Sequence, residues 1–176
     1  AYGQLLVATS AGLYALDPET GGERWSLPGL RDLPADRIEE IAGSPLVLIG
    51  DAGLTGRTLV VNAFNGTLVF DSRVANLTVA STHLLPRSGG LLIAGFESGK
   101  AQPMLFVYGI NDGARRWASD ALAITGRMSG LMNLLATVAI SATNATPVQS
   151  PPLELDDGTF VLGAMGNVLR FDATTG

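Results

Sequence analysis

Short apolar runs separated by polar, glycine-containing turns extend along the whole chain. Four runs open a repeated unit, and a second run follows each of them after a turn or loop. The first runs are residues 5–8, 46–49, 91–94 and 160–163, and the second are residues 13–16, 58–61, 105–108 and 168–171. Apolar runs of this length, bounded by turn signals, predict short β-strands that pair as hairpins.

A turn rich in Asp, Asn or Thr closes each hairpin and ends in glycine, and an aromatic residue follows it. The turn glycines are Gly21, Gly66, Gly113 and Gly176, and the aromatic residues are Trp25, Phe70 and Trp117. Asn-Gly and Asp-Gly turns suit a tight hairpin because glycine adopts a positive φ without steric cost. Successive aromatics stand 45 and 47 residues apart.

A hairpin repeat of about 45 residues has the size of one four-stranded blade of a β-propeller. We therefore predict an all-β chain of about four antiparallel blades, forming part of a larger or incomplete propeller. The predicted blades lie around residues 1–44, 45–89, 90–121 and 153–176. A β-sandwich is the alternative, but a sandwich does not repeat an aromatic residue at a fixed offset.

Residues 15–25 resemble the repeat signature of the PQQ-like (quinoprotein-type) β-propeller family. They read Ala-Leu-Asp-Pro-Glu-Thr-Gly-Gly-Glu-Arg-Trp and match Ala-x-Asp-x-x-Thr-Gly-x-x-x-Trp at every fixed position, while the other copies keep parts of it. The resemblance implies that the aromatic docks on the neighbouring blade and that Asp and Thr hold the turn. It assigns structural roles to Asp17, Thr20, Gly21, Trp25, Gly66, Phe70, Gly113, Trp117, Asp172 and Gly176.

The resemblance leaves two main functions open. Quinoprotein dehydrogenases of this family hold a central cofactor and calcium, often beside a disulfide of adjacent cysteines, whereas other members are scaffolds in membrane-associated complexes. The chain has no cysteine, and both tryptophans occupy docking positions. We therefore expect a non-catalytic, extracytoplasmic scaffold (periplasm, cell surface or secretory lumen) that binds protein partners and no cofactor. The alternatives are a fragment or relative of a quinoprotein oxidoreductase, and a sensor or carbohydrate-binding propeller.

The charge distribution argues against nucleic-acid binding, and the lengths of the apolar runs argue against a transmembrane segment. Eleven Lys and Arg against sixteen Asp and Glu give a net charge of −5, and the basic residues form no cluster, which argues against nucleic-acid binding. No apolar run approaches the ~20 residues that span a bilayer. We expect no transmembrane segment in this sequence.

The sequence contains few candidates for catalysis or metal binding. His83 is the single histidine, and no Gly-x-Ser-x-Gly motif accompanies it, so we interpret it as a strand residue. Mixed charges around residues 31–40 indicate a short solvated helix or turn for the acidic pairs Asp32 with Asp36 and Glu39 with Glu40. Asp156 and Asp157 could suggest calcium, but Gly158 follows them, and a turn is the preferred interpretation.

An insertion interrupts the repeat between the third and fourth copies, where Gly113 and Gly176 stand 63 residues apart. Apolar residues at helical spacing predict a helix of about three turns within an insertion at about 122–152, with a pair of strands as the alternative. Such a helix would cover a blade edge or bind a partner. For the second role the candidate docking residues are Met128, Leu131, Met132 and Leu135.

Overall fold

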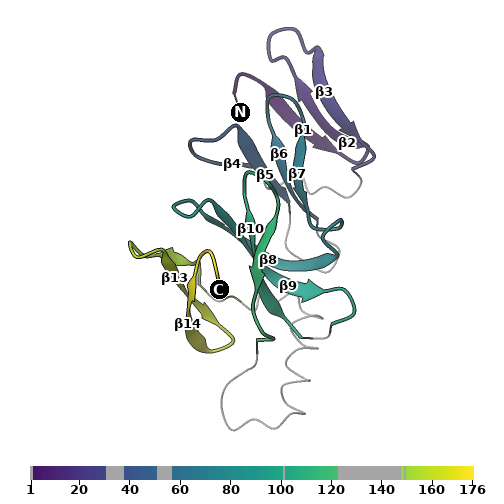
Figure 1. Ribbon diagram of the computed structural model, residues 1–176. Coiled ribbons are helices and arrows are strands. Elements are labelled where there is room, and N and C mark those ends of the chain that lie inside the picture. The colour runs from purple at the N-terminus through teal and green to yellow at the C-terminus, as the bar shows by residue number, and fades with distance from the viewer. Residues whose placement is uncertain (1, 31–37, 51–56, 101, 123–147, 149) are drawn as a thin grey trace.

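The computed structural model describes residues 2–30, 38–50, 57–100, 102–122, 148 and 150–176. Within these ranges every regular element is a β-strand, and antiparallel pairing joins the strands into four sheets (Figure 1). The helix expected around residues 128–138 lies outside the described residues, as do Met128, Leu131, Met132 and Leu135. Asp32 and Asp36 lie outside them too.

The four sheets follow one another along the chain, and each is a meander of consecutive strands. Sheet A contains β1 (Leu5–Thr9), β2 (Gly12–Leu16) and β3 (Glu23–Pro28). Sheet B contains β4 (Ile38–Glu40), β5 (Leu46–Gly50), β6 (Thr58–Asn62) and β7 (Leu68–Asp71). Sheet C contains β8 (Leu77–Leu85), β9 (Gly90–Glu97), β10 (Met104–Gly109) and β11 (Arg115–Ala118), and sheet D contains β12 (Leu153–Glu154), β13 (Thr159–Ala164) and β14 (Asn167–Asp172).

The eight apolar runs of the repeat all form strands, and they pair as predicted. Sheets B and C begin one strand earlier than the repeat units counted from residues 45 and 90, because β4 and β8 pair with β5 and β9. Sheets A and D have three strands rather than the expected four. Strands β1 and β14 are therefore edge strands, at positions where sheets B and C carry one strand more.

The observed conformation of Glu39 and Glu40 differs from the prediction. We expected a short solvated helix or turn, but both residues lie in β4, an exposed strand that pairs with β5. The error arises because a three-residue strand with Ile38 as its one apolar member carries no period-two pattern. Pairing with a fully buried neighbour, rather than the strand's own sequence, determines its conformation.

The central strands of sheets B and C are buried on both faces because each sheet lies between two others. We call the side of a sheet that packs on the next sheet its forward face, and the opposite side its backward face. In β5, Leu48 on the forward face joins the core shared with sheet C, and Val47 and Ile49 on the backward face join the core shared with sheet A. This double burial explains why the strands read as continuous apolar runs.

A third apolar core joins sheets C and D. Leu92 and Leu105 on the forward face of sheet C meet Phe160 and Leu162 on the backward face of sheet D. The sheets thus form a row in which sheet A and sheet D lie at opposite ends (Figure 1). Only the two end sheets keep a face that no other described sheet covers.

Candidate protein-docking site

The four hairpin turns share one backbone geometry. The glycine N–H donates to the carbonyl oxygen four residues earlier, at 2.8 Å for Gly21, 2.9 Å for Gly66 and Gly113, and 3.0 Å for Gly176. All four glycines have φ between 65° and 95°, a left-handed conformation that side chains disfavour. The repeated glycine is therefore required by the backbone of the turn.

In three of the four turns a side chain at the start of the turn fixes its backbone. Asp17 Oδ1 accepts from the amides of Glu19 and Thr20 at 3.0 Å, and Arg24 contacts Oδ2 at 2.5 Å. The Arg24 guanidinium, followed by the Thr20 and Glu19 amides, lowers the pKa of Asp17 to about 2. Asp172 accepts from the amides of two threonines at 2.8 Å, and these bonds lower its pKa in the same way.

The third turn begins with Gly109 instead of Asp, and a neighbouring carboxylate fills the space. A Cβ on Gly109 would lie 2.2 Å from Asp112 Oδ1, and that oxygen accepts from the Ala114 amide at 3.0 Å. The carboxylate therefore comes from a different position of the same turn. The departure from the repeat signature is compensated within the hairpin.

The repeated aromatics each lie against the turn of the next sheet. Trp25 covers Gly66, where a Cβ would come within 2.7 Å of the indole ring, and Trp25 Nε1 donates to Ala63 O at 2.8 Å. A Cβ on Gly113 would meet Val69 O at 2.0 Å, beside Phe70. In each of these contacts, the strand that carries the repeated aromatic packs onto the turn glycine of the next sheet, where the absence of a side chain leaves room for it.

Trp117 makes the corresponding contact between sheets C and D but lacks one bond. Its ring lies 3.2 Å from a Cβ built on Gly176 and stacks on Phe171 with ring centroids 5.4 Å apart. The indole Nε1 is buried and has no hydrogen-bond partner within the described part of the chain. A buried donor without a partner is unfavourable by about 1–3 kcal/mol, so this nitrogen favours an added acceptor.

Turn glycine Gly21 is the exception among the four. It has a φ of +70°, yet no described atom outside its immediate neighbours lies within 4 Å of a Cβ built on it. The residues behind it on sheet A are apolar and incompletely covered, and Leu5 is 53% exposed. In the other three turns, the strand that carries the repeated aromatic of the preceding sheet covers the turn glycine. At Gly21 this position is open among the described residues.

A groove of about 660 Å³ runs beside the edge of sheet D. Its walls come from two segments far apart in the sequence, namely residues 117–122, which include and follow β11, and the β13–β14 hairpin with the turn after it. Trp117 and Phe171 provide aromatic surface, while Ala118 and Ala121 are small and exposed. Val168 borders the groove and is 81% exposed.

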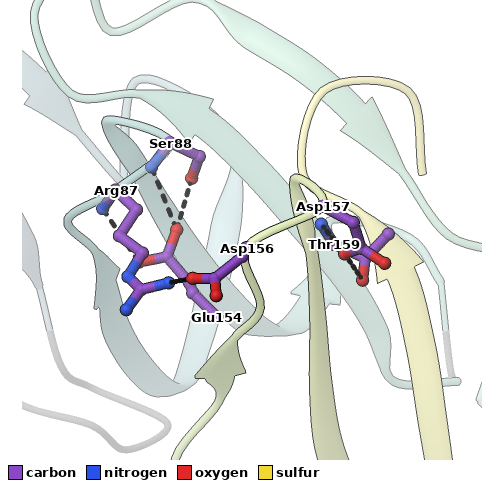
Figure 2. A network of polar contacts seen from close by, with 6 residues as sticks. All are labelled: Arg87, Ser88, Glu154, Asp156, Asp157 and Thr159. Atoms are coloured by element: carbon purple, nitrogen blue, oxygen red, sulfur yellow. Dashed lines mark hydrogen bonds and ion pairs between the residues drawn. The ribbon is translucent and has the colours of Figure 1, made fainter.

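A polar network joins sheets C and D on another part of their interface (Figure 2). The Glu154 carboxylate accepts from the amides of Arg87 and Ser88 at 2.9 and 3.0 Å and from the Ser88 hydroxyl at 2.9 Å. Arg87 also pairs with Asp156, whose side chain is 98% exposed. Glu154 therefore holds β12 onto the β8–β9 turn.

The acidic residues that could suggest calcium already have protein partners. Asp156 pairs with Arg87, and Asp157 accepts from the Thr159 hydroxyl and amide (Figure 2). Asp157 also pairs with Arg170. The Thr159 hydroxyl, followed by the Thr159 amide, lowers the pKa of Asp157. Among the described residues no group of three metal-ligating side chains could hold an ion.

The remaining candidate residues are scattered. His83 lies half-buried in β8, and Glu39 and Glu40 lie on β4 of a different sheet. Among the described residues, none of them belongs to a group of three side chains that could hold a metal ion. Within residues 2–30, 38–50, 57–100, 102–122, 148 and 150–176, no helix is long and apolar enough to cross a membrane.

Sequence reasoning missed Glu154 and the groove residues 118–122. Glu154 stands in a two-residue strand that has no pattern of its own, and the groove depends on the approach of two distant segments. The one available signal is the placement of Trp117, since an aromatic at the docking position predicts that its surroundings border the next sheet.

Comparison with known proteins shows a likeness of fold. No family model and no curated protein matches the sequence. The structure is similar to that of BamB from Moraxella catarrhalis, with a TM-score of 0.51 and 17% identity, over 98% of this chain and 47% of that one. The quinohemoprotein alcohol dehydrogenase ADHIIG from Pseudomonas putida HK5 has a TM-score of 0.49 and 15% identity, over 99% of this chain and 31% of its own.

The chain thus spans about half the length of BamB and less than half the length of the dehydrogenase. At 17% identity the likeness to BamB concerns the arrangement of strands alone. It agrees with the order of sheets, the repeated turns and the aromatic contacts described above. At the level of fold, the four sheets are similar to part of the BamB structure.

Proposed function

We propose that the chain is a non-catalytic scaffold that binds an extended segment of a protein partner in the groove beside β14. The observation that carries this proposal is the groove itself, about 660 Å³ in volume along an edge strand of sheet D. An unpaired strand edge beside a groove with both polar and apolar walls can bind an extended peptide by adding it to the sheet.

The chemistry of the groove supports a peptide backbone as the ligand. In sheets B and C the third strand pairs with a fourth, as β6 does with β7 and β10 with β11, whereas no further strand lies beside β14 among the described residues. A peptide on this edge would supply carbonyl oxygens close to Trp117, whose buried Nε1 has no acceptor in the described part of the chain. Apolar side chains of the peptide would cover the exposed Val168.

We further propose an extracytoplasmic location and partners within a membrane-associated complex. The support is indirect and lies at the level of fold, since BamB has the same arrangement of strands. The oxidoreductase alternative stays a prediction, because no specific feature of the described site favours it.

The proposal is tested by co-purification from a gentle extract, with mass spectrometry of the proteins that accompany the tagged chain. Ala121→Arg places a long charged side chain in the groove, and Ala114→Arg is the matched control at an exposed alanine of the β10–β11 turn. We expect a partner that is retained by the wild type and the control and lost from the groove variant. A chain that migrates without any other protein, or a partner that Ala121→Arg retains, would refute the proposal.

A further inference from the structure

The turn between β6 and β7 holds the one Asn-Gly pair of the sequence, Asn65 and Gly66. Asn65 is exposed at the tip of this hairpin, and Gly66 is buried. An asparagine side chain can react with the main-chain nitrogen of the next residue, because the carboxamide carbon Cγ lies within reach of that nitrogen and the two close a succinimide ring. The turn therefore contains both groups of a possible reaction.

A hydrogen bond holds the Asn65 carboxamide within the turn. Asn65 Oδ1 accepts from the Thr67 amide at 2.9 Å, and the loop of atoms that this bond closes contains both Asn65 Cγ and the Gly66 nitrogen. A donor at the carboxamide oxygen also stabilises the negative charge that gathers there when a nucleophile adds to Cγ. The same bond thus positions the carbon and activates it.

Two contacts slow the reaction in the folded chain. The Gly66 N–H donates to Asn62 O at 2.9 Å, and this proton must leave before the nitrogen can attack. The Trp25 ring covers Gly66, where a Cβ would lie 2.7 Å from the indole. Because Trp25 belongs to sheet A and the turn to sheet B, the reaction requires a brief local opening where the two sheets meet.

Asn62 provides a matched comparison within the same turn. Its Oδ1 accepts from the Phe64 amide, two residues further on, also at 2.9 Å. The next residue is Ala63, which is fully buried and whose N–H donates to Pro45 O at 2.8 Å. A side chain on the residue that supplies the nitrogen restricts the backbone conformations open to ring closure, and glycine removes this restriction. The geometry therefore favours reaction at Asn65 over reaction at Asn62.

We infer that Asn65 is a modification site, at which the Gly66 nitrogen attacks Asn65 Cγ and the carboxamide nitrogen leaves as ammonia. One C–N bond forms as another breaks, and the Gly66 proton is transferred through water to the leaving amine, so the succinimide is neutral. A water molecule then opens the ring. Cleavage at the side-chain carbonyl gives aspartate, and cleavage at the main-chain carbonyl gives isoaspartate, in which the backbone runs through the former side chain.

The two products have different effects on the turn. Aspartate fits, because the third repeat already carries Asp112 directly before its turn glycine, and Asp112 Oδ1 accepts from the Ala114 amide at 3.0 Å. Isoaspartate adds a methylene group to the backbone between Asn62 O and the Gly66 N–H, which are joined at 2.9 Å in the intact turn. This turn no longer presents Gly66 to Trp25, so isoaspartate loosens the contact between sheets A and B.

Peptide mapping by mass spectrometry, during incubation of the folded chain in mildly alkaline buffer, tests the reaction. We expect deamidation at Asn65 to be about tenfold or more faster than at Asn62, and to accelerate with pH because hydroxide removes the Gly66 proton. Urea should accelerate it further, since unfolding breaks the Gly66 hydrogen bond. Asn65→Gln, whose carboxamide is one methylene further from the backbone, is the control and should stay unmodified at this position.

The aged protein tests the consequence for the contact between sheets A and B. Brief proteolysis at increasing urea removes unfolded molecules, and labelling by an isoaspartyl methyltransferase quantifies isoaspartate in the chains that survive. Isoaspartate should disappear at lower urea than the unmodified chain, whereas Asn65→Asp should survive as the wild type does. A folded chain in which Asn65 reacts no faster than Asn62, or isoaspartate molecules that survive as long as the wild type, would overturn the inference.

Discussion

Replacing Gly66 by alanine probes how much the aromatic contact between sheets A and B contributes to stability. The new Cβ would lie 2.7 Å from Trp25 Cε3 and 2.9 Å from Cδ2, so the indole must move. Gly21 is a matched control because its φ of +70° is close to the +73° of Gly66, while no described atom beyond its chain neighbours lies within 4 Å of a Cβ built on it. The two substitutions share the backbone strain and differ in the contact.

The expected loss follows from these two contributions. A left-handed alanine is unfavourable by about 1–2 kcal/mol at either position. At Gly66, overpacking against a partly buried ring adds about 1–3 kcal/mol, and displacement of the Trp25 hydrogen bond to Ala63 O adds about 1 kcal/mol. We therefore expect Gly66→Ala to lower the free energy of unfolding by about 2–4 kcal/mol more than Gly21→Ala.

Equilibrium urea unfolding followed by far-UV circular dichroism measures this difference, at a concentration below any self-association. In a Trp25→Ala background the obstructing ring is absent, so Gly66→Ala should cost no more than Gly21→Ala. Equal losses for the two alanine variants in the wild-type background would show that Trp25 does not hold this position. The same conclusion would follow if the difference persisted without Trp25.

Two further predictions concern carboxylates in the turns. Because the pKa of Asp17 is lowered from 3.8 to about 2, its carboxylate stabilises the fold above pH 4, and this contribution is lost as pH falls through about 2. Urea unfolding at several pH values should therefore show the stability difference between wild type and Asp17→Asn shrinking across this interval, whereas a constant difference would contradict the assignment. Glu154→Gln should lower the free energy of unfolding by about 2 kcal/mol, since the carboxylate accepts three hydrogen bonds. Asp156→Asn, at a residue 98% exposed, should change it by less than about 0.5 kcal/mol in the same assay.

The strand pairs were predictable because their residues alternate between two apolar interfaces. Leu48 and Ile49 face different sheets, and both sides select for apolar residues, so the run is continuous and bounded by turns. The glycine turns were also predictable, since their positive φ imposes a residue type. These local requirements are strong enough to be read from one sequence.

Other parts of the fold depend on neighbours rather than on local pattern. Strand β4 is exposed along its length, and β12 has two residues, so neither could be found from periodicity. The groove beside β14 requires residues 117–122 to approach a hairpin about 50 residues further along the chain. Roles assigned to residues 128–135 stay predictions, because these residues lie outside the described part of the chain.

Pairing between consecutive strands has a consequence for folding. Each described sheet can form from a stretch of about 20–40 residues before the next has been synthesised, and such local topology favours rapid folding. Stability then accumulates through contacts between nearest neighbours, as in other repeat architectures. Opening is expected to start at the two end sheets and to reach sheets B and C last, so slow amide hydrogen exchange should be concentrated in β5, β6, β9 and β10.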